Sequence, residues 1–246
     1  GWCDWSSDVC SSDLLRADPM TAHENQTASF VFSFTDPDAQ HWTWSVDFGD
    51  GTPPVSGTAD APGTVTVPHV FADDSPTGRF TAVVTLSDGV SETSASVENT
   101  VLNVAPTLDP VAEIVLDEGE TLTLGGDTAW HFTDPGFGPL EAWTWSIAWG
   151  DGTTDGGAVT DTQPGAAGLD SDGWIGASHT YGDNRAAGEP YTAQLTVTDD
   201  DGGRATVAIT IRVANVEPTL RPTANLTVNE GAVLTMPDIA FEDPGF

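Results

Sequence analysis

The fold is decided by a stretch that reads WTWSVDFGDGT over residues 42–52 and returns as WTWSIAWGDGT over residues 143–153. Each copy begins with apolar and hydroxyl residues in alternation, which is the period of a half-buried β-strand. The Gly-Asp-Gly step that follows suits a tight hairpin turn, because glycine readily adopts the positive φ that such turns need. The sequence therefore predicts two copies of an aromatic strand that runs directly into a turn.

Shorter motifs recur around this stretch and divide the chain into units. They are FTDP at 34–37 and 132–135 with FEDP at 241–244, HVF at 69–71 with HTY at 179–181, NVAPTL at 103–108 with NVEPTL at 215–220, and EG at 118–119 and 230–231. A repeat of roughly 100 residues follows from these spacings. We assign a first module to residues 15–105, a second to 106–217 and the truncated start of a third to 218–246. We expect the native protein to continue beyond both ends.

The modules are predicted to be all-β. Residues 191–198 alternate strictly, with Tyr191, Ala193, Leu195 and Val197 on one face, and residues 80–86 and 205–213 follow the same pattern. This period of two, with Gly, Asp and Pro at the boundaries, indicates half-buried strands. No stretch shows helical periodicity over two turns. About seven short strands per module predict tandem immunoglobulin-like antiparallel β-sandwiches.

The first fourteen residues are set apart from the modules. Both cysteines of the chain, Cys3 and Cys10, lie there. Residues 4–14 resemble the translation of a common sequencing-library adapter. We therefore treat residues 1–14 as an unstructured artefact and exclude them from the fold. The alternative interpretations are a C-x6-C metal half-site and a disulfide loop.

The composition is strongly acidic. Asp and Glu number 38 against 6 basic residues, none of them lysine, and the formal net charge is −32 at pH 7. Binding to nucleic acid is excluded, because it requires cations near phosphate. For the same reason we expect no binding to an anionic membrane surface. No apolar run approaches the ~20 residues of a membrane span, so we expect no membrane insertion of this fragment. The charge favours solubility, tolerance of high salt, or divalent cations.

Together these motifs resemble the PKD (polycystic kidney disease) domain, an immunoglobulin-like module. The resemblance rests on DFGDG at 47–51, WGDG at 149–152, HTY at 179–181 and the alternating strand and turn of 191–202, and it covers nearly everything after residue 15. The first module departs from the pattern, with Phe71 and Phe80 at tyrosine positions and Val46 where tryptophan is usual. The resemblance implies a bacterial or archaeal cell-surface or secreted protein, with roles in spacing, adhesion, or contact with carbohydrate or protein.

The sequence offers no catalytic constellation. Asp50-Gly51-Thr52 and its copy at 151–153 reverse the order of the aspartic-protease loop and sit where a hairpin turn is expected. No H-E-x-x-H, G-x-S-x-G or P-loop pattern occurs. His69 and His179 recur at one repeat position, which indicates a side-chain hydrogen bond that closes a turn rather than metal ligation. We therefore expect that the chain is not an enzyme.

The paired tryptophans admit two interpretations. Alternation places both rings of Trp42-Thr43-Trp44, and of the copy at 143–145, on one face. Core packing is the simpler interpretation. The alternative is that Trp42 and Trp143 are partly exposed and form a platform for stacking of sugars or a contact between modules.

A calcium site is predicted where the modules meet. Loops B–C and F–G of an immunoglobulin-type sandwich lie at one end, where the chain also enters the module. The groups expected to converge there are Asn103, Asp134, Asp199, Asp200 and Asp201. Calcium takes six to eight oxygen ligands, several of them carboxylates, and such clustering is unfavourable without a cation. An ordinary Asp-rich turn is the alternative. The first module offers a thinner set, Asp36, Asp38 and Asp88.

Two functions are compatible with these observations. The first is a structural or adhesive repeat region of a cell-surface or secreted protein, made rigid by calcium at its module junctions. The second is a set of accessory modules of a secreted protease or glycosidase that bind carbohydrate or protein at the cell surface.

Overall fold

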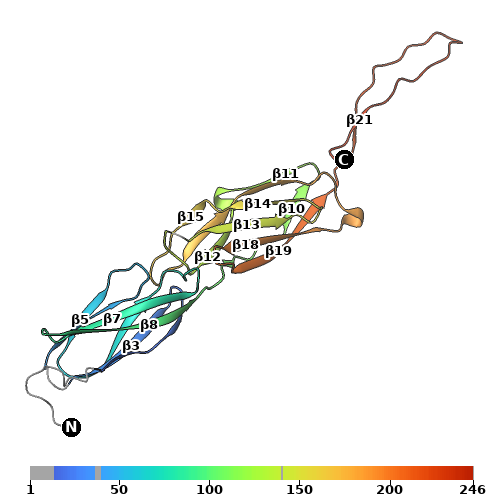
Figure 1. Cartoon of the computed structure of the whole chain (residues 1–246). Coiled ribbons are helices and arrows are strands. Elements are labelled where there is room, and N and C mark those ends of the chain that lie inside the picture. The colour runs from blue at the N-terminus through green and yellow to red at the C-terminus, as the bar shows by residue number, and fades with distance from the viewer. Residues whose placement is uncertain (1–13, 37–39, 140, 246) are drawn as a thin grey trace, which may run out of the picture.

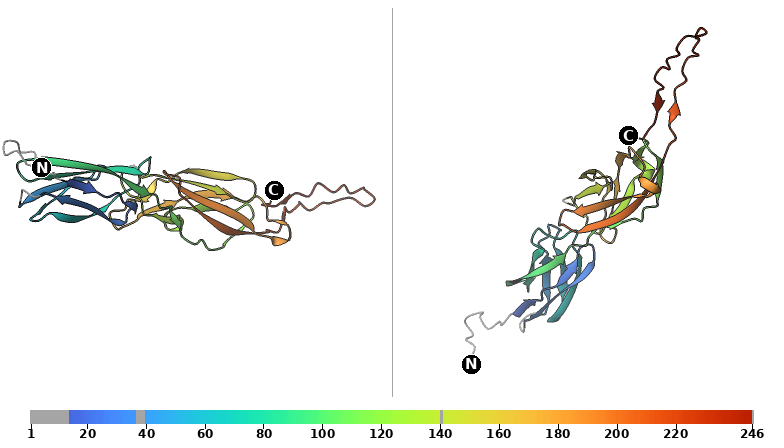
Figure 2. Two further views of the ribbon diagram at one scale, coloured as in Figure 1. Left: turned by 60° about the horizontal axis from the view of Figure 1, so that its bottom comes forward. Right: turned by 90° about the vertical axis from the view of Figure 1, so that its right-hand side faces the viewer.

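The computed structural model describes residues 14–36, 40–139 and 141–245. Figures 1 and 2 show two β-sandwiches arranged end to end, followed by an extended two-stranded loop that projects beyond the second sandwich. Among the described residues, no helix is long and apolar enough to cross a bilayer. Residues 1–13 of the excluded segment lie outside this description. Leu14, which we had assigned to that segment, begins the first strand, so the predicted boundary there is wrong by one residue.

The first sandwich consists of two sheets. Three strands form one of them, in the order β1 (Leu14–Ala17), β3 (Thr27–Thr35), β6 (Gly63–Val70). Five strands form the other, in the order β2 (Thr21–His23), β8 (Glu92–Leu102), β7 (Arg79–Ser87), β4 (Trp42–Asp47), β5 (Val55–Ala59). Neighbouring strands are antiparallel except β2 and β8, which run parallel.

The second sandwich repeats this plan with additions. Its larger sheet has the order β10 (Ile114–Asp117), β19 (Arg204–Ala214), β18 (Tyr191–Asp199), β13 (Trp143–Ala148), β14 (Thr154–Ala158), with β10 and β19 parallel. The opposing layer contains β15 (Asp161–Gln163), β16 (Ser171–Ile175), β12 (Trp130–Asp134), β9 (Thr107–Leu108), and the pair β11 (Thr121–Leu124) with β17 (Ala177–Thr180). The remaining elements are the short 3-10 helices η1 (Gly126–Thr128) and η2 (Ala186–Gly188), and a final pair, β20 (Thr219–Leu220) with β21 (Phe241–Glu242).

Each sandwich has its own core, and alternation along the strands fills it. Strand β18 buries Ala193, Leu195 and Val197, as the period of two predicts. Trp42 is 1% exposed and Trp143 is 6% exposed, so neither ring offers a face to a ligand. The prediction that these two rings stack on sugars is therefore wrong. The reason is that the apolar face of each aromatic strand meets the opposing sheet, and the simpler interpretation of core packing holds.

A histidine side chain is hydrogen-bonded to the aspartate of the Gly-Asp-Gly turn in both modules. His69 Nε2 lies 2.7 Å from Asp50 Oδ2, and His179 Nε2 lies 2.7 Å from Asp151 Oδ2. The ring of His69 stacks on Phe48 with centroids 3.7 Å apart, and that of His179 stacks on Trp149 at 4.4 Å. Burial raises the pKa of Asp50, but the hydrogen bonds from His69 and Thr52 outweigh it and lower that pKa to about 2. The predicted structural hydrogen bond of these histidines is confirmed.

The two glycines of the Gly-Asp-Gly turn in the second module differ in the space available for a side chain, and this difference can be tested by substitution. At Gly150, φ is +86° and a Cβ would lie 2.5 Å from the carbonyl oxygen of Thr192. We expect Gly150→Ala to lower the free energy of unfolding by about 2–5 kcal/mol through backbone strain and steric overlap. Gly152→Ala is the control, because φ is +99° but a Cβ would meet nothing within 4 Å. It should cost about 1–3 kcal/mol. Urea denaturation of the full chain measures both, and equal losses would contradict the steric argument.

Candidate functional site

The two sandwiches are joined by direct hydrogen bonds as well as by the linker. Phe137 N donates to Ala72 O at 2.9 Å, and Gly168 N donates to the side-chain oxygen of Asn25 at 2.7 Å. Within the linker, Val104 N donates to Glu24 Oε1 at 2.8 Å. Both modules therefore contribute fixed groups to this junction, which Figure 2 shows where the blue-to-green first sandwich meets the second.

A turn with a left-handed residue places Glu24 at the junction. Asn25 has φ +53°, and its equivalent in the second module, Gly119, has φ +75°. Asparagine is among the few residues with a side chain that adopt this conformation readily. The backbone amide of each donates a hydrogen bond to the backbone carbonyl of an aromatic residue. Asn25 N donates to Phe71 O and Gly119 N donates to Tyr181 O, both at 2.8 Å. Glu24 is consequently only 2% exposed, with its carboxylate directed at the linker.

The residues predicted from the sequence gather at this junction. Asn103 Nδ2 donates to Asp199 Oδ2 at 3.1 Å, which joins the linker to the end of β18. Asp134 ends β12 and accepts hydrogen bonds from Trp143 Nε1 at 3.0 Å and from Gly136 N at 2.9 Å. Asp200 Oδ1 accepts the amide of Ala142 at 3.2 Å. The sandwich geometry thus brings the B–C loop, the F–G loop and the linker together.

The thinner set of the first module does not lie there. Asp36 accepts a hydrogen bond from Trp42 Nε1 at 2.7 Å. Asp88 accepts the amides of Val90 and Ser91 within its own loop, at the end of β7 remote from the linker. Asp38 lies outside the described residues.

Four acidic residues at the junction were missed by sequence reasoning. They are Glu24, Asp73 and Asp74 of the first module and Glu141 of the second. Side-chain oxygens of Glu24, Asp73 and Asp74 lie within 4.8 Å of one another, and so do those of Asp73, Asp200 and Asp201. Asp73 belongs to both triads, and the second triad spans the two modules. Alignment of the two repeats would have pointed to two of these residues, because it pairs Asp73 with Asp183 and Glu24 with Glu118.

Burial and mutual repulsion raise the pKa values of these carboxyl groups. Burial is the main cause for Glu141, whose pKa rises to about 9, and repulsion from Asp134, Asp73, Asp200 and Glu24 adds to it. Burial likewise raises the pKa of Glu24 to about 8, against the hydrogen bond from Val104. The pKa of Asp74 rises to about 7, and those of Asp73 and Asp134 rise to about 6, again with burial first and neighbouring carboxylates contributing. The junction therefore holds carboxylates that are costly to ionise together.

The donor set of this cluster fits a hard divalent cation. Asp73 Oδ1 and Asp74 Oδ1 are buried and have no hydrogen-bond partner among the described residues. Unpaired buried oxygens are unfavourable, and carboxylate oxygens are the ligands that calcium prefers. Asp200 and Asp201 of the predicted set belong to a triad. Asn103, Asp134 and Asp199 surround the triads and are engaged in the hydrogen bonds described above.

Repulsion in the cluster makes stability depend on pH in the absence of metal. A carboxyl group with a raised folded-state pKa destabilises the fold only when it ionises, so stability is greatest below the unfolded value of 4.5 and falls as pH rises toward about 9. We expect Glu141→Gln, melted in a chelator, to raise the melting temperature at pH 8 and to flatten this fall. Glu92→Gln, at an exposed carboxylate on β8, is the control. An equal effect of Glu141→Gln at pH 5 and pH 8 would contradict the repulsion.

One family model matches the first module. Residues 15–101 match the family model of the PKD domain. Solved structures of tandem immunoglobulin domains match over 82–84% of the chain. Titin domains Z1Z2 in complex with telethonin are 15% identical, with a TM-score of 0.36, and the match covers 83% of this chain and 96% of that one. DIP-gamma IG1+IG2 is 10% identical, with a TM-score of 0.35 and coverages of 82% and 97%. The N-terminal four Ig domains of Dscam1 isoform 7.44 are 12% identical, with a TM-score of 0.40 and coverages of 84% and 47%. The search of curated proteins gave no match.

Proposed function

We propose that this chain, whose residues 15–101 form a PKD domain, is a structural or adhesive region of a secreted or cell-surface protein in which calcium fixes the joint between modules. Domains of this kind are generally non-catalytic, and we expect no catalysis here. The observation that carries the proposal is the carboxylate cluster that spans the joint, with Asp73 facing Asp200 and Asp201. The resemblance to PKD repeats favours a bacterial or archaeal source.

Electrostatics gives calcium its effect on the joint. Without a cation, the carboxylates of the two modules repel one another across a buried space, which weakens the contact. A calcium ion held by Asp73 of the first module and by Asp200 and Asp201 of the second reverses the sign of this interaction. The ion would also supply the missing partners of Asp73 Oδ1 and Asp74 Oδ1. Such a joint is stiff with calcium and loose without it.

The hydrogen bond from the linker to the turn glutamate recurs at the end of the second module. Val216 N donates to Glu118 Oε1 at 2.8 Å, as Val104 N does to Glu24. A Cβ at Gly119 would lie 3.0 Å from the carbonyl oxygen of Pro244, so the third unit approaches the same turn. Asp183 and Asp243 occupy the repeat positions of Asp73 and Asp134. Recurrence of the acidic residues supports a role that every joint shares.

A second candidate is an accessory module that binds carbohydrate or protein for a secreted hydrolase. Trp42 and Trp143 are buried and do not support it. The observation that favours it is an open cavity beside Trp174 in the second module.

Thermal melts of the full chain test the calcium proposal. They are run in chelator, in calcium, in magnesium and in sodium chloride of matched ionic strength. We expect calcium alone to raise the melting temperature, with a stabilisation of about 2.7 kcal/mol at a hundredfold excess over Kd. Small-angle scattering should show a more uniform, extended shape in calcium.

The variant Asp73→Asn sharpens this test, because Asp73 belongs to both triads. It should abolish the calcium response and, in chelator, should leave the chain at least as stable as the parent. Asp127→Asn in η1, away from the junction, is the matched control. An equal response of parent and variant, or an equal response to every salt, would mean generic screening of the −32 charges and would overturn the proposal.

A further inference from the structure

A cavity of about 280 Å³ opens on the side of the second sandwich, between η1 and the connection from β14 to β15. Two indoles line it, Trp145 of β13 and Trp174 of β16. Its rim includes Gly125 and Gly126, where a Cβ would meet no atom within 4 Å. The volume is just below the range of about 300–1,000 Å³ that holds a drug-sized ligand. The space therefore suits a single ring-sized group.

The polar groups in this lining are unengaged. Among the described residues, no hydrogen bond is formed by the indole N–H of Trp145, the indole N–H of Trp174 or the carboxylate of Asp161. An indole offers a broad apolar face together with one N–H donor. A pyranose ring has the complementary surface, with C–H groups on its faces and hydroxyls around its edge.

A row of side chains supports Trp174 on the outer face of the sheet. Trp174 lies directly opposite Asp161 of β15 on one side and His131 of β12 on the other. Residues opposite one another in antiparallel strands share a face. The ring of His131 lies 5.3 Å from that of Trp174, and both its nitrogens are held, by Asp109 and Asp172, each at 2.9 Å. The neighbour of Trp174 is thus fixed in place.

This row continues into a second cavity of about 360 Å³, whose lining includes Asp109, Trp130 and His131. Both cavities border Ala129. A chain of several rings that occupied the first cavity could therefore continue past His131 into the second.

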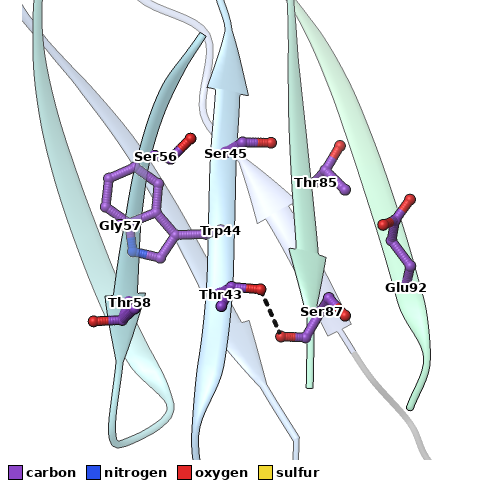
Figure 3. A pocket seen from close by; sticks show the side chains of 9 residues that line it. All are labelled: Thr43, Trp44, Ser45, Ser56, Gly57, Thr58, Thr85, Ser87 and Glu92. Atoms are coloured by element: carbon purple, nitrogen blue, oxygen red, sulfur yellow. Dashed lines mark hydrogen bonds between the residues drawn. The ribbon is translucent and has the colours of Figure 1, made fainter. Parts of the chain in front are cut away.

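The first module has a cavity of about 430 Å³ beside Trp44, but this cavity has neither the second indole nor the neighbouring histidine of the second module. Strands β3 and β6 of the first module pair Ser33 with Thr64, where β12 and β16 pair His131 with Trp174. No counterpart of β15 follows β5 in the described part of that module. The equivalent of Trp145 is Trp44, and Figure 3 shows its indole lying beside Gly57 among small hydroxyl side chains. A Cβ at Gly57 would overlap that ring, and Phe32 packs edge-on against it at 5.6 Å. Trp174, its histidine neighbour and β15 are therefore the additions of the second module to the shared fold.

Charge limits what this cavity can hold. Asp161 lines it, Asp109 and Asp172 flank His131, and the whole chain carries −32. Phosphates, sulfated glycans and uronic acids would be repelled. Carboxylates do accept hydrogen bonds from neutral hydroxyls. We propose that the second module binds a neutral polysaccharide, with one pyranose residue stacked in the cavity lined by Trp145 and Trp174. This binding does not depend on calcium at the junction.

Binding of the full chain is measured with insoluble cellulose, chitin and mannan, and by titration with the hexasaccharides of these polymers, in calcium and in chelator. Polygalacturonate and a decaproline peptide serve as the anionic and peptide probes. We expect binding to at least one neutral polymer, unchanged by chelator, with quenching of tryptophan fluorescence. Trp174→Thr, which installs the residue of the first module, should lower the association constant about tenfold or more. Trp174→Phe should retain most of the affinity, and Asp161→Ala should lose part of it.

Thr58→Ala, on the hydroxyl-lined face of the first module, is the matched control and should bind as the parent does. Melting curves show whether each variant remains folded. The proposal is overturned if no neutral glycan of the panel binds, if Trp174→Thr binds as tightly as the parent, or if polygalacturonate or decaproline binds in preference to the sugars.

Discussion

A hydrogen bond from a buried indole to a buried carboxylate joins the two sheets at one end of each sandwich. Trp42 Nε1 donates to Asp36 Oδ2 at 2.7 Å, and Trp143 Nε1 donates to Asp134 Oδ2 at 3.0 Å. Each group makes the burial of the other tolerable, because a core indole N–H needs an acceptor and a core carboxylate needs a donor. The bond pins the end of one strand to the start of the next across the sandwich. In the second module it also fixes Asp134 at the junction, where its charge acts on Glu24 and Glu141.

The junction is consequently an extension of the core's own arrangement. The turn at Glu24 and Asn25 is held by the hydrogen bond from Asn25 N to the carbonyl of Phe71. Asp73 and Asp74 lie two and three positions after Phe71 in the chain. The F–G loop follows β18, which buries Ala193, Leu195 and Val197 in the core. Acidic groups are thus held close together by backbone that the two cores keep in place, which concentrates repulsion where a cation can relieve it.

Much of this architecture could be predicted from the sequence, because it depends on local pattern. Alternation gave the strands, Gly-Asp-Gly gave the turns, and the general geometry of a sandwich brought Asp134 and Asp199 to one end. Glu24, Asp73 and Asp74 were missed because they become neighbours of the second module only through the relative orientation of two sandwiches. The burial of Trp42 was not decided by alternation either, since the pattern puts two rings on one face without saying which face is covered. Trp174 stands out only when strand pairing aligns it with Thr64 of the first module.

The parallel pairing of β2 with β8, and of β10 with β19, has a mechanical consequence. In each module the early strand and the last strand run side by side in the same direction, so tension applied to the two ends of the chain pulls them past each other. The hydrogen bonds between them then bear the load together in shear instead of opening one at a time from an end. Without calcium the joint, with few bonds between modules, would extend first under force. A series of such modules would behave as resistant blocks connected by compliant segments.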